Sequence, residues 1–247
     1  MTIKVQNKDA FLDAAAYGLV RIVREKLEKK QCDVDCQNHK GYTALILAAT
    51  KGFSNVVEAL IAHNCNFDLQ NNEGETALMK SIYWGYMGII ETLIAHNCNL
   101  DLQDNIGRTA LMCAAHNGLK VVHSLLAHNC NPDLQNNVGE TALMLAARWN
   151  DNDIVELLLA HKCNLNIQGN NGRTALMMTA GYGGKSMVEV LLAHKCNLDL
   201  QDNNCETALM IAKRKNHVEI VELIENQLRR DRNWEHRKAL MLSLIHI

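Results

Sequence analysis

The apolar positions of this chain recur with a fixed period. The tripeptide Thr-Ala-Leu begins at residues 43, 76, 109, 141, 174 and 207, at spacings of 33, 33, 32, 33 and 33 residues. With Thr counted as position 0, small or apolar residues fall mostly at +2, +5, +6 and +9, one stripe of a helix at 100° per residue. The Thr hydroxyl can satisfy a free N–H of the first turn. Each copy therefore predicts an amphipathic helix that ends at the Gly or Asn of position +9.

A second helix is predicted in each copy by apolar pairs, such as Val56 and Val57 followed by Leu60 and Ile61. A polar stretch with turn residues then leads to the next Thr. A unit of this length at a fixed period indicates a solenoid whose copies pack only on their neighbours. Residues 9–29 fit an atypical first copy with Gly18 at position +9. We expect a capping repeat at residues 1–38, six repeats at 39–227 and a tail at 228–247.

This helix–turn–helix unit resembles the ankyrin repeat over about residues 9–227. The segment "NHVEIVELI" (216–224) nearly repeats the family's second helix, and the turn glycine of the family is matched by Gly41, Gly74, Gly107, Gly139 and Gly172. The resemblance implies an all-α solenoid of stacked helix–turn–helix units with β-turn or hairpin connectors. It also implies a concave groove, lined by the first helices, in which partner proteins bind.

The chain departs from the family pattern in consistent ways. Ala replaces the family's Pro, and Met or Ile replaces its His, so we expect soft methionine packing in the first helices. These methionines are Met79, Met112, Met144, Met177 and Met210. Cys205 replaces the turn glycine of the last copy, which predicts an altered hairpin there. Lys162 and Lys195 replace the family's glycine after the second helix, where the resemblance implies a left-handed backbone. The third copy lacks one residue, which we expect to be lost from its interhelical turn.

Charge and composition exclude several classes of function. The net charge is −2, from 25 basic and 27 acidic residues, which gives no reason to expect nucleic acid or an anionic membrane as a partner. No apolar run approaches the ~20 residues of a membrane span, and the opening residues do not form a signal peptide. Nine cysteines favour a reducing compartment, the cytoplasm or the nucleus. We expect a monomer that needs no cofactor.

Motifs that suggest chemistry have structural explanations. His-x-Cys recurs at residues 63, 96, 128, 161 and 194, but zinc ligands lie roughly 2.0–2.3 Å from one ion. Equivalent residues of stacked helices are ~8–10 Å apart, so we expect neither a metal site nor disulfides. The segment "TAGYGGKS" (179–186) lacks the first glycine and the preceding strand of a phosphate-binding loop. No catalytic constellation is present, and we expect the protein not to be an enzyme.

The copies differ most at positions +7 and +8 of the first helix, which the helical wheel places opposite the buried stripe together with +4. Five of the eleven Phe, Trp and Tyr residues fall on these two positions. One interpretation is that the rings are ordinary surface residues or pack between copies. The other is that they bind a partner, because Trp, Tyr and Arg dominate binding hot spots. The predicted partner-binding residues are Tyr17, Lys51, Tyr83, Trp84, His116, Asn117, Arg148, Trp149, Tyr182 and Arg214.

Two further patterns concern charge and the tail. The residue before Thr alternates in charge from Glu75 onward, which predicts opposite charges side by side along the connectors. The tail mixes basic residues with Asp231 and Glu235 and then ends in an apolar run. We interpret it as a helix that covers the last repeat. A truncated further domain and a non-native "LSLIHI" ending are the alternatives.

Together these features predict a non-catalytic scaffold that binds an unknown protein or peptide. The alternative is the substrate-targeting part of a larger enzyme or ubiquitin-ligase adaptor whose effector domain lies elsewhere.

Overall fold

The computed structural model describes residues 2–115 and 118–245, with side chains described for residues 8–115 and 118–232. The described residues form fourteen helices and no strand. The chain divides into two compact units, Met1–Asn137 and Val138–Ile247, which we name unit 1 and unit 2.

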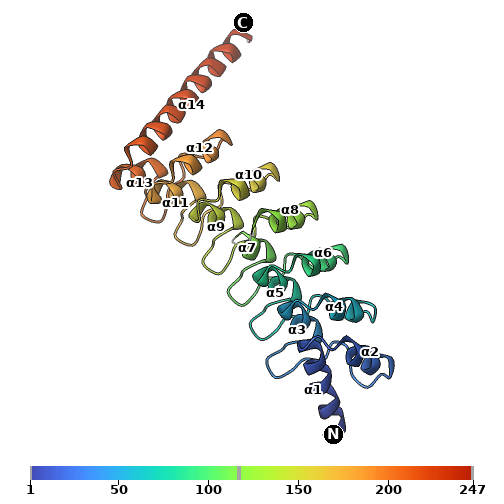
Figure 1. Cartoon of the computed structure of the whole chain (residues 1–247). Coiled ribbons are helices and arrows are strands. Elements are labelled where there is room, and N and C mark those ends of the chain that lie inside the picture. Colours follow the sequence, from blue (N-terminus) through green and yellow to red (C-terminus); the bar gives the residue numbers. More distant parts are fainter. Residues whose placement is uncertain (1, 116–117, 246–247) are drawn as a thin grey trace. The chain divides into compact units, whose positions relative to one another are not determined.

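Unit 1 consists of four helical pairs. The first helices of the pairs are α1 (Thr2–Ala16), α3 (Ala44–Lys51), α5 (Ala77–Trp84) and α7 (Ala110–Ala114). The second helices are α2 (Val20–Glu28), α4 (Ser54–Ile61), α6 (Met87–Ala95) and α8 (Leu119–Ala127). Within this unit the first helices form one row and the second helices another (Figure 1). Each helix thus packs on its pair and on its neighbours in the row.

Unit 2 has the same two-row arrangement. Its first helices are α9 (Ala142–Arg148), α11 (Ala175–Tyr182) and α13 (Ala208–Arg214). Its second helices are α10 (Asn152–Ala160), α12 (Lys185–Ala193) and the long α14 (Val218–Ile245). No helix among the described parts of the chain is both long and apolar enough to cross a lipid bilayer.

The repeated Thr is the N-cap of the six first helices that follow α1, as predicted. The Oγ1 atom of Thr43 accepts a hydrogen bond from the backbone N–H of Ile46 at 3.1 Å. The equivalent bonds in the other five copies measure 3.2–3.3 Å. Such a cap satisfies an N–H that the helix itself leaves open, and its loss costs about 1 kcal/mol. The starts of these six helices are therefore set by their own sequence.

Three of the first helices also end where the sequence predicts, whereas α9 and α13 end one residue earlier, at the caps Trp149 and Lys215. Gly52, Gly85 and Gly183 end α3, α5 and α11 in the left-handed conformation. In the short third copy, α8 begins directly after Gly118, whereas α6 begins two residues after Gly85. The missing residue is therefore lost from the interhelical turn, as expected.

The core of each unit lies between the two rows. In unit 1, Leu78 and Ile82 of α5 and Ile89 and Ile90 of α6 are all fully buried. Each such side chain stabilises the fold by roughly 1.5–3 kcal/mol relative to exposure. The apolar stripe inferred from the sequence is therefore the packing surface.

Methionine packing is confirmed for four of the five copies. Met79, Met112, Met144 and Met177 are buried, but Met210 is 50 % exposed, so the prediction is wrong for α13. In the described structure no further first helix follows α13. The side chain at position +3 of the last copy therefore lacks the neighbour that covers it elsewhere.

The connectors bond to one another within each unit. In unit 1 the Nε2 of Gln70 donates to the backbone oxygen of Gln103 at 2.8 Å. In unit 2 the Nε2 of Gln168 donates to the oxygen of Gln201 at the same distance. These bonds recur at the repeat period and hold each connector against the next.

Cys205 keeps the hairpin of the other copies, so the predicted alteration is wrong. Its φ is 60°, and its N–H donates to the oxygen of Asp202 at 2.9 Å, as the N–H of Gly172 donates to the oxygen of Gly169 at 2.8 Å. A Cβ on Gly172 would lie 2.7 Å from the backbone nitrogen of Asn203 in the next connector. No connector follows Cys205 in the described structure, so a side chain fits there.

Lys162 and Lys195 have φ values of 59° and 57° at the ends of α10 and α12, which confirms the left-handed backbone. Asn64, Asn97 and Asn129 hold the same conformation in unit 1. Asn tolerates this region better than other non-glycine residues, so the strained members of the series are these two lysines and Lys30 of unit 1, whose φ is 48°.

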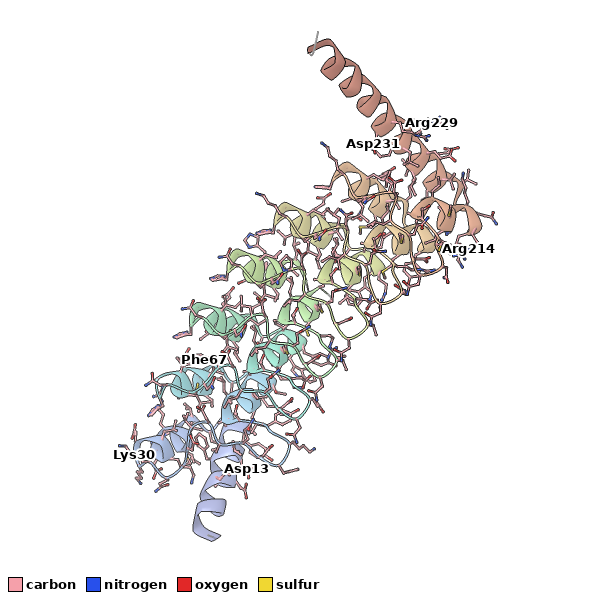
Figure 2. All side chains as sticks on the ribbon, turned by 180° about the vertical axis from the view of Figure 1, so that it is seen from behind. Asp13, Lys30, Phe67, Arg214, Arg229 and Asp231 are labelled. Atoms are coloured by element: carbon pink, nitrogen blue, oxygen red, sulfur yellow. The ribbon has the colours of Figure 1, made fainter. Side chains whose placement is uncertain are left out.

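The tail continues the second helix of the last copy. Because α14 runs unbroken from Val218 to Ile245, the boundary expected between residues 227 and 228 falls inside a helix. Its first turns bury Ile220 and Ile224 against α12 and α13. The rest of the helix extends away from the other helices of unit 2 and does not fold back over α13 (Figure 1). Figure 2 shows Arg229 and Asp231 on this extending part.

Candidate functional site

In unit 1, four predicted partner-binding residues are exposed on or directly after the first helices. We name this set strip 1: Tyr17 directly after α1, Lys51 of α3, and Tyr83 and Trp84 of α5. Positions +7 and +8 lie opposite the buried stripe of each helix, so the helical period itself turns these side chains outward. Trp84 is 54 % exposed and Tyr83 is 66 % exposed. The two largest rings of strip 1 therefore remain open to solvent.

The rings of Tyr83 and Trp84 pack against each other edge to face. Their centroids are 5.2 Å apart and their planes make an angle of 83°. An aromatic pair of this geometry is worth about 0.5–1.5 kcal/mol beyond its buried area. The contact restricts both rings before any partner arrives, which lowers the entropy that binding would cost.

In unit 2, the corresponding set is strip 2: Arg148 and Trp149 at the end of α9, Tyr182 of α11 and Arg214 of α13. Trp149 is 44 % exposed and Tyr182 is 65 % exposed. Figure 2 shows Arg214 on α13, in the first-helix row. Strip 2 therefore offers two aromatic rings and two arginines, where strip 1 offers three aromatic rings and a lysine.

Both arginines of strip 2 are held by the glutamate that precedes Thr in their own copy. Arg148 pairs with Glu140, and Arg214 binds Glu206 through Nε at 2.7 Å and Nη2 at 2.8 Å. The hydrogen bond from Arg214 lowers the pKa of Glu206 below its ordinary value. A fork–fork contact of this kind fixes the guanidinium plane, so the flat face of Arg214 is oriented in advance.

Opposite charges of neighbouring copies interact along the connectors, as predicted: Glu75 acts on Arg108, and Arg173 acts on Glu206. Their direct ion pairs, however, are made with other residues. Glu75 pairs with Lys80 of its own copy at 2.7 Å, and Arg108 pairs with Asp104 of its own connector at 2.9 Å. Only Arg173 reaches the next copy, where it meets a buried aspartate rather than the glutamate before Thr. The side chains reach partners within their own copy first because these lie closer than the next connector.

Position +4 is not part of the exposed face, contrary to the helical wheel. Leu145, Met178 and Ile211 occupy it in unit 2, and all three are buried. In unit 1 the side chain of Lys80 at this position turns toward Glu75 in the connector. The connector lies beside position +4, which a wheel of the helix alone cannot show.

The predicted partner-binding residues do not all fall on one described surface. His116 and Asn117 lie outside the described residues. Trp84 belongs to unit 1 and Trp149 to unit 2. The structure therefore brings together strip 1 and, independently, strip 2.

The recurring His and Cys residues have separate structural roles. The Nδ1 atom of His63 lies 2.9 Å from the carbonyl oxygen of Ala59, one turn back in α4, and the same contact recurs in four other copies at 2.8–3.0 Å. Cys65 and Cys98 are buried free thiols, and burial raises the pKa of each to about 12. Such thiols stay protonated and are poor metal ligands. No metal-binding cluster occurs among the described side chains.

The segment 179–186 is an interhelical turn. Thr179 is buried in α11, and its hydroxyl donates to the oxygen of Leu176 at 2.9 Å. Gly183 ends α11 and Lys185 begins α12, where its ammonium pairs with Glu219 at 3.0 Å. The lysine of the motif is thus engaged by a neighbouring second helix.

Sequence reasoning missed a cavity in unit 2. It lies between two neighbouring connectors and the helices α9 and α11, and it is lined by both Met144 and Met178. The feature of the sequence that could have predicted this cavity is Gly169, because the other five copies carry Asn or Asp at that position. One glycine in an otherwise uniform column marks the place where a side chain is missing.

Comparison with known proteins agrees with this architecture. A family model described as "Ankyrin repeats (3 copies)" matches residues 11–104, 86–169 and 151–233. No curated protein gives a significant match. The chain is similar to the solved ankyrin repeat domain of Bcl-3, described as a unique member of the IkappaB protein family. The TM-score is 0.78 and the identity 23 %, over 86 % of this chain and 97 % of that chain. This likeness concerns the fold, which does not by itself identify a ligand.

Proposed function

Because the chain belongs to the ankyrin repeat family, whose members are generally protein–protein interaction modules, we propose that it is a non-catalytic scaffold for a partner protein. Strip 1 in unit 1 and strip 2 in unit 2 are each proposed as a binding surface. The proposed partner segment is a helix or an extended peptide that lies along the exposed first helices. The proposed setting is the cytoplasm or the nucleus, with the scaffold acting as a monomer.

The observation that carries this proposal is the exposure of aromatic rings at two fixed positions. The copies are nearly identical elsewhere, and their other large apolar side chains are mostly buried. Scattered apolar residues on a surface need no explanation, but these rings recur at the same two positions of the repeat in both units. Trp, Tyr and Arg are the residues that contribute most at interfaces. Partner binding accounts for this concentration, whereas packing between copies would bury the rings.

The test compares single alanine variants in a capture assay. Trp84→Ala and Trp149→Ala should each weaken partner capture by about thirtyfold or more, because truncating a central aromatic anchor costs at least ~2 kcal/mol. Both variants should remain folded: Trp84→Ala loses its edge-to-face contact with Tyr83, about 0.5–1.5 kcal/mol, and neither ring is a core side chain. Partners are first identified by their loss from both variants relative to the wild type, and affinities are then measured with purified partner.

Matched controls come from exposed apolar residues outside the strips. Leu119→Ala in unit 1 and Val218→Ala in unit 2 remove exposed side chains from the second-helix row and should leave capture unchanged. Leu158→Ala removes a fully buried side chain and should lower stability by roughly 2–5 kcal/mol without a specific loss of binding. Tryptophan variants that unfold would show that the rings are structural. Tryptophan variants that fold and bind normally would place recognition outside the strips.

A further inference from the structure

The cavity in unit 2 has a volume of about 260 Å³. Met144 and Met178 form its apolar part, and Gly169, Asn171 and Arg173 of one connector form its polar wall. Met178 precedes Tyr182 of strip 2 by one turn of α11. The cavity is therefore close enough to strip 2 for one partner segment to contact both.

The cavity lies at a position where the other copies have a polar side chain and this copy has none. Position −5 relative to Thr is Asn or Asp in five copies and Gly169 in the sixth. In four of the five, a side-chain oxygen accepts the backbone N–H two residues further on, at 2.9–3.0 Å. Glycine has no such oxygen. The N–H of Asn171 consequently has no acceptor among the residues that the structure describes.

The backbone around Gly169 is nevertheless that of the other copies. Its N–H donates to the oxygen of Arg173 at 2.9 Å, and its oxygen accepts from Gly172 at 2.8 Å. At Asp104 the same two bonds measure 3.0 and 2.8 Å. The connector has thus kept its backbone path. Oδ1 of Asn171 accepts the N–H of Arg173 at 3.0 Å, so the N–H of Asn171 is the backbone donor that still lacks an acceptor oxygen.

The connector at Asp104 shows which group fits at this position. Its Oδ1 accepts from the N–H of Ile106 at 3.0 Å and of Arg108 at 2.8 Å, and its Oδ2 accepts from Nε of Arg108 at 2.9 Å. The Gly169 copy also has an arginine before Thr, but no carboxylate in its own connector. A carboxylate is therefore the group that the polar wall of the cavity lacks.

The other charged groups around the cavity do not use all the donors that such a carboxylate would need. The Nε of Arg173 donates instead to Asp202 of the next connector at 3.1 Å. The terminal amino groups of Arg173 bind no partner in the described part of the structure. Glu140 also lines the cavity, but its charge is balanced by the ion pair with Arg148. Arg173 is thus a cation with donors to spare beside the unpaired N–H of Asn171.

We infer that the cavity is a subsite for one acidic side chain, Asp or Glu, of the partner segment. Its carboxylate accepts from the N–H of Asn171 and from the terminal amino groups of Arg173. Its aliphatic stem, with the apolar residues beside it, lies against Met144 and Met178. The inference rests on the proposed function only for the source of the carboxylate, a partner protein.

The test uses the full chain and two short peptides with blocked ends. The peptide acetyl-Ala-Leu-Asp-Leu-Ala-amide is titrated into ¹⁵N-labelled protein, with the Asn171 amide as the reporter. Its proton signal should move downfield and saturate with a Kd of about 1 mM or below, in the range of one small contact set. The matched peptide with Asn in place of Asp should bind at least tenfold more weakly, because it lacks the charge.

Variants at Gly169 separate the carboxylate slot from the backbone. A Cβ at this position would lie 3.3 Å from the oxygen of Gly139 and 3.4 Å from Oδ1 of Asn171, so a side chain is accommodated by a small shift. Gly169→Asp places a carboxylate of the protein itself in the cavity, and it should therefore abolish binding of the peptide. Gly169→Ala adds the Cβ alone and should keep binding within a few fold. Arg173→Gln should weaken it at least tenfold.

Equal binding of the two peptides, or unchanged binding to Gly169→Asp, would overturn the inference. Equal shifts with free acetate would do so too, because they would show a general anion site. Val218→Ala, which changes an exposed residue outside the strips, should leave the peptide titration unchanged. A peptide that binds while both tryptophan variants capture normally would support the subsite and refute the proposed function. If the peptide does not bind while both tryptophan variants lose partner capture, the subsite is refuted and the proposed function is supported.

Discussion

Gly172→Ala provides a direct test of how neighbouring connectors constrain each other. Gly172 has a φ of 75°, and a Cβ there would lie 2.5 Å from Oδ1 and 2.7 Å from the backbone nitrogen of Asn203. Asn203 in turn makes two bonds to the Gly172 connector, from N to the oxygen of Asn171 at 3.1 Å and from Nδ2 to the oxygen of Asn170 at 2.9 Å. The added methyl group must displace Asn203 and disturb both bonds.

The expected cost has two parts. A left-handed alanine costs about 1–2 kcal/mol, of which about 0.4–1 kcal/mol is offset because alanine has less freedom than glycine in the unfolded chain. Two disturbed hydrogen bonds cost about 0.5–1.5 kcal/mol each. We therefore expect Gly172→Ala to lower the free energy of unfolding by about 2–3 kcal/mol.

Cys205 provides the matched control, because it has the same backbone conformation with no connector after it in the described structure. Cys205→Ala should change stability by less than about 0.5 kcal/mol. Cys205→Gly should raise it by no more than about 1 kcal/mol, the net backbone contribution alone. Urea unfolding followed by circular dichroism gives each midpoint, and an unchanged slope shows that the midpoints can be compared. If Gly172→Ala costs only as much as Cys205→Gly gains, backbone strain explains both and the clash with Asn203 is refuted.

Two further predictions concern unit 2. Lys162→Gly and Lys195→Gly should each raise the urea midpoint, by about 0.5–1 kcal/mol in stability, because glycine adopts the left-handed conformation without strain; a lower midpoint for both would contradict this. Burial disfavours the charge of Asp202, but the N–H of Glu206 and the contact with Arg173 outweigh it and hold the pKa of Asp202 below its ordinary value. Its stabilisation is therefore present above the unfolded pKa of about 3.9 and is lost as the pH falls through the lower folded pKa. Asp202→Asn should flatten the acid side of the stability–pH curve, and an unchanged curve would refute the assignment.

Local features of this chain are readable from its sequence. A Thr cap and the glycine that ends α3 act within one or two turns, so their pattern predicts where a first helix with both residues begins and ends. The left-handed backbone at Lys162 follows from the family glycine that it replaces. The outward direction of Trp84 and Trp149 follows from helical periodicity alone.

Contacts between copies could not be predicted from the sequence pattern of a single copy. The exposure of Met210 depends on the absence of a covering first helix in the described structure, and the tolerance of Cys205 depends on the absence of a following connector.

The burial of Met178 depends on a connector that a helical wheel does not include. The cavity at Gly169 likewise depends on Met144 and Met178 from two different helices. Sequence determined the repeat and its exposed residues, because hydrogen bonds and side-chain directions within a helix are local. Tertiary structure decided which side chains are covered and where a slot stays open, because those outcomes depend on atoms about thirty residues away along the chain.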